Sequence, residues 1–465
     1  MTVHRGVAAR VAAGMLAAAV LLGACTGAGG DAPSPSATPT VEPTQPAVVE
    51  LPDSPAGEQA RWVLEQLDAP AGSGLPEVEE RFSAELLAQV PSDELVAVVE
   101  QLRPLAPWTV TGVEAGPDAL VAQIGGQGQD LEMQLAVDEA GLIAGLFFGE
   151  AAPAREPAAD AAALLDEVAG LPGSSLLVAE VLDGACVPVE GLVGGSSAGA
   201  ELPVGSIAKL WVLGAVVDAI AAGTLAWEDE VTVTDALRSL PSGELQDAEA
   251  GTTLTVREAA QKMIEISDNT ATDLLIDAVG REAVERAMVD MGHADPGINI
   301  PFASTRELFH LGWGDPTLRE RWSGADEAGR RALLAELPPG PPEIDPAAMS
   351  LVAAWPDGVD WFATAADVCA AHAALAERAQ TPAGEPLTEI LTANPGVTPD
   401  DAWSSIAYKG GSSVGTMAGS WYAVPAGDGP PVVVVLQTAA RSANDAVAAR
   451  TMVGIAEDAL RLAAP

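Results

Sequence analysis

Ser206 and Lys209 have the residue types and the spacing of a nucleophile and its base. They stand three residues apart in the segment SIAKLWVLGAVVDAIAA, so one helical turn would place both on the same face. A lysine that is removed from water has a lowered pKa and can take the proton of a neighbouring serine. The pair predicts acyl transfer through a serine ester, with Ser206 as the nucleophile.

The segment GSSAG at 195–199 is a competing serine motif. It matches G-x-S-x-G, which forms a nucleophile elbow only when a strand leads into it and a helix follows at once. No predicted strand runs directly into this glycine- and serine-rich loop, and Pro203 stands before the next helix. We therefore interpret Ser197 as a loop residue.

Two further motifs contain the other groups that such chemistry needs. The tripeptide S-D-N occupies 267–269, 61 residues after Ser206 and between two predicted helices. The tripeptide K-G-G occupies 409–411 on a predicted strand. The chain has only three lysines, and two of them, Lys209 and Lys409, fall in these motifs.

The segment 206–222 is apolar nearly all round, which predicts a buried central helix in which Lys209 must be neutral or paired.

The elements that would position these residues form a larger second domain. Strands are predicted at 175–182 and 185–190, and again at 406–410, 417–424 and 432–437. Helices are predicted at 158–169 and 444–462, with a mostly helical stretch over 206–385. This order implies one sheet built from both ends of the domain, with a helical cluster inserted and a concave seam between them.

A smaller domain precedes it. Helices are predicted at 56–67 and 92–102, the second with Ser92 as its N-cap, and strands at 108–113, 120–124, 131–137 and 142–148. This α+β pattern ends near residue 150 and is followed by the linker AAPAREPAAD. It contains no constellation of catalytic residue types, so we interpret it as a structural or docking module.

The first 24 residues have the pattern of an export signal. Arg5 and Arg10 precede an apolar stretch over 11–22, which is too short to span a bilayer comfortably, and the tetrad LGAC ends at Cys25. This tetrad resembles the bacterial lipobox, so we expect a lipid on Cys25, a proline-rich tether over 25–54 and a location at the extracytoplasmic face of the cell membrane. Outside the cytoplasm, Cys186 and Cys369 either pair or remain buried thiols.

Charge and composition exclude several function classes. The chain has 22 Lys and Arg against 66 Asp and Glu, a net charge of −44, which disfavours nucleic acid as a partner. The four histidines and three cysteines show no zinc-ligand spacing. We expect neither a metal nor another cofactor.

The ordered triple S-x-x-K, S-D-N and K-G-G resembles the active-site serine β-lactamases and penicillin-binding proteins. The segments VGSIAKLWVLGAVV, LRSLPSGELQD, MIEISDNTATD and PFASTRELF more closely resemble the two-domain serine hydrolase of the clavulanic acid gene cluster. The resemblance covers about 55–465. It implies a small steroid-isomerase-like (cystatin-like) α+β domain over 55–150 and a class A β-lactamase-like domain over 157–465.

The resemblance also implies a role for each motif residue. Ser206 would be acylated, Lys209 would be its general base, Ser267 would pass a proton to the leaving group, and Lys409 would attract an anionic group of the substrate. The oxyanion hole would be formed by the backbone N–H groups of Ser206 and Ser412. Substrate-binding positions implied in this way are Asn269, Tyr408, Gly411, Ser412 and Met417.

Two departures from the family pattern bear on the substrate. Gly410 replaces the usual threonine, whose hydroxyl Ser412 or Ser413 could supply. The loop DPGINIPFASTREL lacks the glutamate that positions the deacylating water, and Glu307 is expected to be a surface residue of a helix. We therefore expect an exported serine hydrolase that turns over esters and hydrolyses β-lactams slowly. The alternatives are a D-alanyl-D-alanine peptidase and a non-catalytic penicillin-fold binding lipoprotein.

Overall fold

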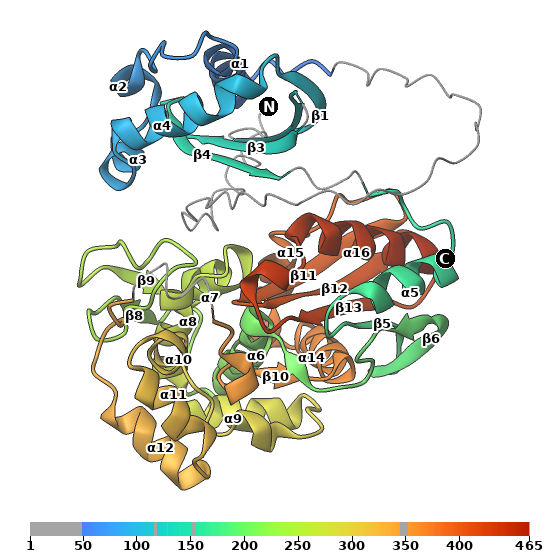
Figure 1. Cartoon of the computed structure of the whole chain (residues 1–465). Coiled ribbons are helices and arrows are strands. Elements are labelled where there is room, and N and C mark those ends of the chain that lie inside the picture. Colours follow the sequence, from blue (N-terminus) through green and yellow to red (C-terminus); the bar gives the residue numbers. More distant parts are fainter. Residues whose placement is uncertain are drawn as a thin grey trace, which may run out of the picture. The chain divides into compact units, whose positions relative to one another are not determined.

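The chain folds into two units, the first ending at Ala154 and the second beginning at Arg155 (Figure 1). The computed structural model describes residues 49–464 except for 116–118, 128, 139, 151–154 and 345–351. The predicted signal peptide, Cys25 and most of the tether lie outside the described residues. Among the residues described, no helix is long and apolar enough to cross a membrane.

The first unit consists of short helices followed by a four-stranded antiparallel meander. The helical segments are α1 (Pro55–Leu67), α2 (Val78–Arg81), α3 (Ala84–Gln89), α4 (Ser92–Leu102) and the 3-10 turn η1 (Arg103–Leu105). The strands, in the order in which they pair, are β1 (Thr109–Ala115), β2 (Ala119–Gly125), β3 (Asp130–Val137) and β4 (Ile143–Glu150).

The two longest helices of this unit differ in how they are capped. The Ser54 hydroxyl caps α1 by accepting from the Gly57 N–H at 3.1 Å, and Pro55 occupies the first helical position. The predicted N-cap of α4 is wrong by one residue. Pro91 is the N-cap of α4 and Ser92 is already helical, so no side chain caps this helix.

The second unit is built on a five-stranded antiparallel sheet. Its strands are β5 (Ser175–Leu182), β6 (Ala185–Gly194), β11 (Trp403–Ser413), β12 (Thr416–Pro425) and β13 (Val432–Ala439). They pair in the order β11-β12-β13-β5-β6, so that β13, near the end of the chain, lies beside β5, near the start of the unit. The β6 strand continues four residues beyond the predicted end.

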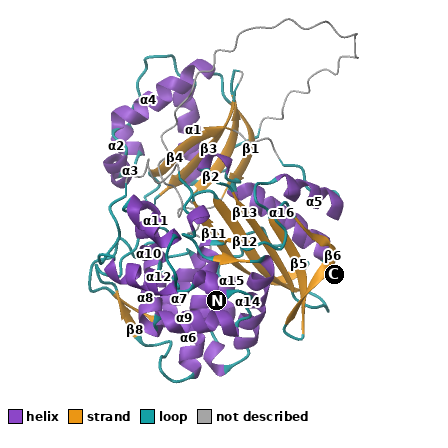
Figure 2. Cartoon of the chain, turned by 60° about the horizontal axis from the view of Figure 1, so that its bottom comes forward, coloured by secondary structure: helices purple, strands orange, loops and turns teal. Residues whose placement is uncertain are grey.

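Helices cover both faces of this sheet (Figure 2). On β13 the side chains alternate, so Val434 and Leu436 join a cluster with α5 (Ala161–Gly170) and α16 (Ala449–Ala463). Val433 and Val435 join the opposite cluster, which contains α6 (Lys209–Ala221) and α14 (Ala365–Arg378). Because both faces are covered, every residue of β13 is buried.

A helical cluster occupies the chain between β6 and β11. Besides α6 and α14, its α-helices are α7 (Val256–Glu265), α8 (Asn269–Val279), α9 (Arg281–Asp290), α10 (Thr305–Trp313), α11 (Pro316–Ser323), α12 (Glu327–Glu336) and α15 (Leu387–Thr392). Its 3-10 turns are η2 (Gly205–Ala208), η3 (Pro296–Asn299), η4 (Trp355–Asp357) and η5 (Pro382–Gly384). Its strand pairs are β7 (Leu202–Pro203) with β10 (Phe362–Ala363) and β8 (Glu230–Thr232) with β9 (Thr253–Thr255).

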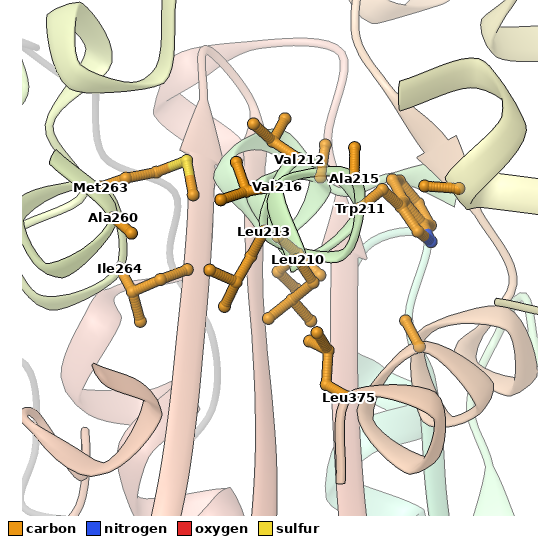
Figure 3. Packing of buried hydrophobic residues seen from close by; sticks show 14 of the residues in the cluster. Leu210, Trp211, Val212, Leu213, Ala215, Val216, Ala260, Met263, Ile264 and Leu375 are labelled. Atoms are coloured by element: carbon orange, nitrogen blue, oxygen red, sulfur yellow. The ribbon is translucent and has the colours of Figure 1, made fainter. Parts of the chain in front are cut away.

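The α6 helix is the centre of the cluster, as its all-round apolar sequence predicts. Every residue from 209 to 217 is buried. Figure 3 shows Met263 and Ile264 of α7 and Leu375 of α14 packed around Leu210 and Leu213 of α6. A disulfide between Cys186 of β6 and Cys369 of α14, with a Cα–Cα distance of 6.3 Å, settles the pairing that the sequence left open.

Candidate active site

The start of α6 places a serine and a lysine one turn apart at the edge of the buried core. Ser206 lies in η2 and is half-buried, whereas Lys209, the first residue of α6, is 1% exposed. The preceding Gly205 has φ +50°, a left-handed conformation that favours glycine. The glycine therefore allows the sharp entry into the turn that presents Ser206.

The Lys209 amine is held by the S-D-N segment. Its Nζ donates to the carbonyl of Ser267 at 2.6 Å, to the Ser267 hydroxyl at 3.1 Å and to Asn269 Oδ1 at 2.7 Å. Within the described part of the chain, it makes no hydrogen bond to Ser206. Burial lowers the pKa of Lys209 to about 7, against the opposing influence of the Asp268 and Asp273 carboxylates. A large fraction of this amine is therefore neutral at pH 7 and can accept a proton.

The S-D-N segment links α7 to α8, as predicted, and each residue has a separate task. Ser267 has φ +57°, which turns the chain between the helices. The Asp268 carboxylate caps α8 through the Ala271 N–H at 2.8 Å and accepts two more N–H groups from the segment 244–245. Asn269 donates to the Leu240 carbonyl at 3.0 Å, so its oxygen is the atom that faces Lys209.

The strand lysine approaches the same serine from the other side. Lys409 is 2% exposed, and its Nζ donates to the Ser267 hydroxyl at 3.0 Å and to the Gly410 carbonyl at 2.8 Å. Burial and the neighbouring Lys209 charge hold the pKa of Lys409 well below its usual value. The Ser267 hydroxyl therefore bridges two amines and can move a proton between them and a bound molecule.

The backbones of η2 and β11 approach each other closely. A Cβ placed on Gly411 would lie 1.9 Å from the Val204 carbonyl oxygen and 2.7 Å from Ser206 N. A Cβ placed on Gly205 would lie 2.8 Å from Ser412 N. Only glycine fits at these two positions, and the N–H groups predicted for the oxyanion hole belong to the two facing segments.

The structure does not leave Ser413 free to replace the missing threonine hydroxyl. The Ser413 hydroxyl donates to Asp360 Oδ2 at 2.7 Å, whereas the Ser412 residue is exposed. The expectation that either serine could supply that hydroxyl is therefore wrong for Ser413.

Tyr408 and Met417 do not lie on the face of the sheet that carries Lys409. Both belong to the cluster on the α16 side, where the Tyr408 ring lies 5.2 Å from the Trp421 ring. The reason is strand alternation, since Tyr408 and Lys409 are consecutive and must point to opposite faces. Their assignment to the substrate pocket is corrected accordingly.

Family comparison covers the first two motifs of the second unit, S-x-x-K and S-D-N. Residues 194–330 match the model described as the β-lactamase enzyme family. This part of the larger unit is therefore similar to that family. Residues 51–143 match a second family model, described as the N-terminal part of an ORF 12 gene product, which identifies a distinct N-terminal domain. The steroid-isomerase-like character of that domain remains a prediction. No curated protein sequence matches the chain.

Solved structures similar to this chain include β-lactamases and PBP-A. A β-lactamase from Sphaerobacter thermophilus is 21% identical with a TM-score of 0.45, over 65% of this chain and 95% of that one. A structure of PBP-A is 16% identical with a TM-score of 0.43, over 67% and 99%. A β-lactamase from Xanthomonas campestris is 18% identical with a TM-score of 0.43, over 65% and 96%.

Glu307 of the larger unit is not the surface residue that the sequence predicts. It lies in α10 but is 4% exposed, because its carboxylate closes a capping box with Ser304 and pairs with Arg281 at 2.7 Å. Both carboxylate oxygens are thus occupied by structural partners. The predicted location of Glu307 in a helix is confirmed, and its predicted exposure is wrong. Its contacts are those of a structural residue.

The competing motif at 195–199 forms a turn between two strands. Contrary to prediction, β6 runs directly into it, but β7 rather than a helix follows. The Ser196 hydroxyl donates to the Leu171 carbonyl at 3.0 Å and accepts from the Ser174 N–H at 2.9 Å. The segment therefore lacks the strand–turn–helix geometry of an elbow.

Sequence reasoning missed several residues that support the site. The Ser242 hydroxyl donates to the Ser267 carbonyl at 2.8 Å, beside Lys209. The Ser420 hydroxyl donates to the Lys409 carbonyl at 2.9 Å and contacts His372 Nε2 at 2.9 Å. Ser242 lies in the segment LRSLPSGELQD, but no role was predicted for it, and no motif marks Ser420 or His372. Each of these residues acts through a partner on a distant segment. Among the described residues, no group of three or more His, Cys, Asp or Glu side chains could hold a metal ion.

Proposed function

We propose that the β-lactamase-like unit is a serine hydrolase that acts through an acyl-enzyme on Ser206. The observation that supports this most strongly is the buried Lys209 amine, which is one turn from Ser206 and has its pKa lowered to about 7. A charged lysine in an apolar helix is energetically costly unless it is paired or neutral. A neutral amine at this position can act as a general base.

Acylation would use Lys209, Ser267 and the two facing N–H groups in sequence. Neutral Lys209 accepts the Ser206 hydroxyl proton while the Ser206 oxygen attacks the acyl carbon. The N–H groups of Ser206 and Ser412 stabilise the resulting oxyanion. When the intermediate collapses, the bond to the leaving group breaks and Ser267 donates its proton to that group. Ser267 recovers a proton from protonated Lys209, with which it is already hydrogen-bonded.

Deacylation would favour esters over β-lactams. The alcohol of an ester diffuses away, which opens the Lys209 side to a water molecule that the amine can activate. The amine released from a β-lactam stays tethered to the acyl group and obstructs that side. Because both oxygens of Glu307 are engaged by structural partners, this residue offers no second base. The substrate class proposed is therefore a simple ester, with slow lactam turnover.

The test is pre-steady-state kinetics with an ester, a penicillin and an acyl-D-Ala-D-Ala peptide, together with mass spectrometry of the adduct. We expect ester turnover, a persistent penicilloyl adduct on Ser206 and little peptide hydrolysis. Fast lactam turnover without an adduct, unchanged in Glu307→Gln, would show that another residue activates the water. Faster peptide hydrolysis would favour the peptidase alternative, and no adduct with any compound would favour a binding protein.

We further propose that the mature protein is held at the outer face of the cell membrane by lipid on Cys25. The support is the LGAC tetrad and the proline-rich segment that follows it. Detergent partitioning of the wild type and of Cys25→Ala tests this. The wild type should enter the detergent phase and the variant should not, and equal partitioning would contradict the anchor.

A further inference from the structure

A buried carboxylate outside the predicted catalytic set lies beside the segment that carries Ser206. Asp360 immediately precedes the 361–363 segment and is 9% exposed. The β10 strand pairs with β7, and the Val204 N–H donates to the Trp361 carbonyl at 2.8 Å. The carboxylate thus lies alongside the backbone that leads from β7 into η2.

The two oxygens of Asp360 hold two different segments. Oδ1 accepts the N–H of Gly205 at 2.9 Å and that of Trp361 at 2.8 Å. Oδ2 accepts the hydroxyl of Ser413 at 2.7 Å. One carboxylate therefore links the residue before Ser206 to the residue after Ser412.

The two linked segments are those that contribute the N–H groups of the proposed oxyanion hole. Such donors are effective only when they lie about 2.7–3.1 Å from the oxygen that becomes charged. A displacement of about 1 Å can lower a rate by a large factor, even when it originates away from the reacting atoms. The separation of η2 from β11 therefore has to be fixed.

We propose that Asp360 is a positioning residue that sets the separation between the Ser206 and Ser412 N–H groups by holding Gly205 and Ser413. Its effect on turnover rests on the acyl-enzyme function proposed above, whereas the link between the two segments can be measured without any substrate. Asp360 itself touches no reacting atom.

The charge state of Asp360 is compatible with this role. Burial raises its pKa to about 6, and the Ser413, Gly205 and Trp361 donors oppose that rise. The carboxylate is therefore mostly ionised at neutral pH and can accept from all three donors.

The kinetic test breaks the link from the β11 side. Ser413→Ala removes the hydroxyl, Ser413→Thr retains it, and Ser404→Ala is the matched control, because its hydroxyl donates to the Val424 carbonyl at the far end of the same strand. For p-nitrophenyl acetate we expect Ser413→Ala to lower kcat about tenfold with KM within about twofold. Ser413→Thr and Ser404→Ala should stay within about twofold of the wild type. Unchanged kcat in Ser413→Ala, or an equal loss in Ser404→Ala, would overturn the proposal.

The second variant series breaks the link at its centre. In Asp360→Asn the amide oxygen can still accept from Gly205 and the amide nitrogen can donate to Ser413, so activity should remain near that of the wild type. Asp360→Ala should lose at least as much kcat as Ser413→Ala, and adding Ser413→Ala to it should cause no further loss. Additive losses would show that the two residues act separately and would contradict a shared link.

Hydrogen–deuterium exchange separates a failure of this inference from a failure of the proposed function. In Ser413→Ala, but not in Ser404→Ala, amides in peptides covering 203–207 and 411–413 should exchange faster. If the wild type hydrolyses no ester but these amides respond, the proposed function is wrong and the link stands. If the amides do not respond, the link is wrong, whatever the kinetics show.

Discussion

The serines at 196–197 and at 206 lie within ten residues of each other, both in short motifs that could signal a nucleophile, yet their surroundings differ in kind. The Ser196 hydroxyl is engaged by the Leu171 carbonyl and the Ser174 N–H in a turn between strands. Ser206 stands where a turn enters a buried helix, one turn from an amine with a lowered pKa. The difference shows that a serine motif predicts a nucleophile only where the fold places ionisable groups beside the serine.

The two serines also differ in the ionisable groups around them. Among the described residues, no hydrogen bond joins Ser196 to a lysine, whereas the Ser206 site assembles Lys209, Ser267 and Lys409 from α6, the α7–α8 junction and β11. Both amines are almost wholly buried. In water the Lys209 amine would be protonated near pH 7, and its burial makes it available as a proton acceptor.

The largest expected effect separates the two motifs directly. Ser206→Ala should lower kcat for ester hydrolysis by at least about a thousandfold and abolish fluorophosphonate labelling, because it removes the nucleophile. Ser197→Ala should stay within about twofold of the wild type. Labelling that survives Ser206→Ala and disappears in Ser197→Ala would move the site to the turn.

The next largest effect tests whether Lys209 is the group that makes Ser206, and not Ser197, the nucleophile. Lys209→Met should lower kcat about 10²–10⁴-fold, the usual contribution of a positioned general base. The melting temperature should not fall, since an apolar side chain of similar length replaces a desolvated amine. Lys262→Met, which removes the half-buried partner of Glu244, is the control and should leave kcat within about twofold. A small loss in Lys209→Met would mean that another group accepts the Ser206 proton.

A smaller effect appears in the pH dependence. Because Lys209 must be neutral and has a pKa of about 7, the acylation rate should rise about tenfold from pH 6 to pH 8 and then level off. The same amine titrates near 10.5 in the unfolded chain, so the unfolded state binds more protons between these values. The stability of the wild type relative to Lys209→Met should therefore rise from about pH 7 to about pH 10.5. Stopped-flow acylation and urea unfolding across this range measure both, and a flat difference in stability would contradict the lowered pKa.

The smallest effect concerns the turn alone. Ser196→Ala should lower the free energy of unfolding by about 1 kcal/mol, because the bonds to Leu171 and Ser174 are lost, while kcat is unchanged. Urea titration followed by tryptophan fluorescence measures the first quantity and steady-state kinetics the second. A variant with native stability but reduced kcat would mean that the turn contributes to catalysis.

Much of the local structure follows from the sequence. The largely apolar segment 175–182 predicts β5 to the residue, and the apolar run after Ser206 predicts a helix buried on all sides. The S-D-N motif is predicted at a junction between two helices, and the structure has it there. These features depend on side-chain periodicity and on capping over a few residues, which a sequence displays directly.

The contacts between distant segments required the tertiary structure. The sequence indicated Ser206, Lys209, Ser267 and Lys409 through motif spacing, but it assigned Tyr408 and Met417 to the wrong face of the sheet and Glu307 to the surface. Asp360, one of 66 acidic residues, is marked only by its contacts with Gly205, 155 residues away, and Ser413, 53 residues away. Likewise, the pKa of Lys209 depends on how many apolar residues from other helices surround it. Burial and long-range hydrogen bonds are properties of the packed chain, so the sequence alone determined the motif residues and the tertiary structure decided their charge states and supports.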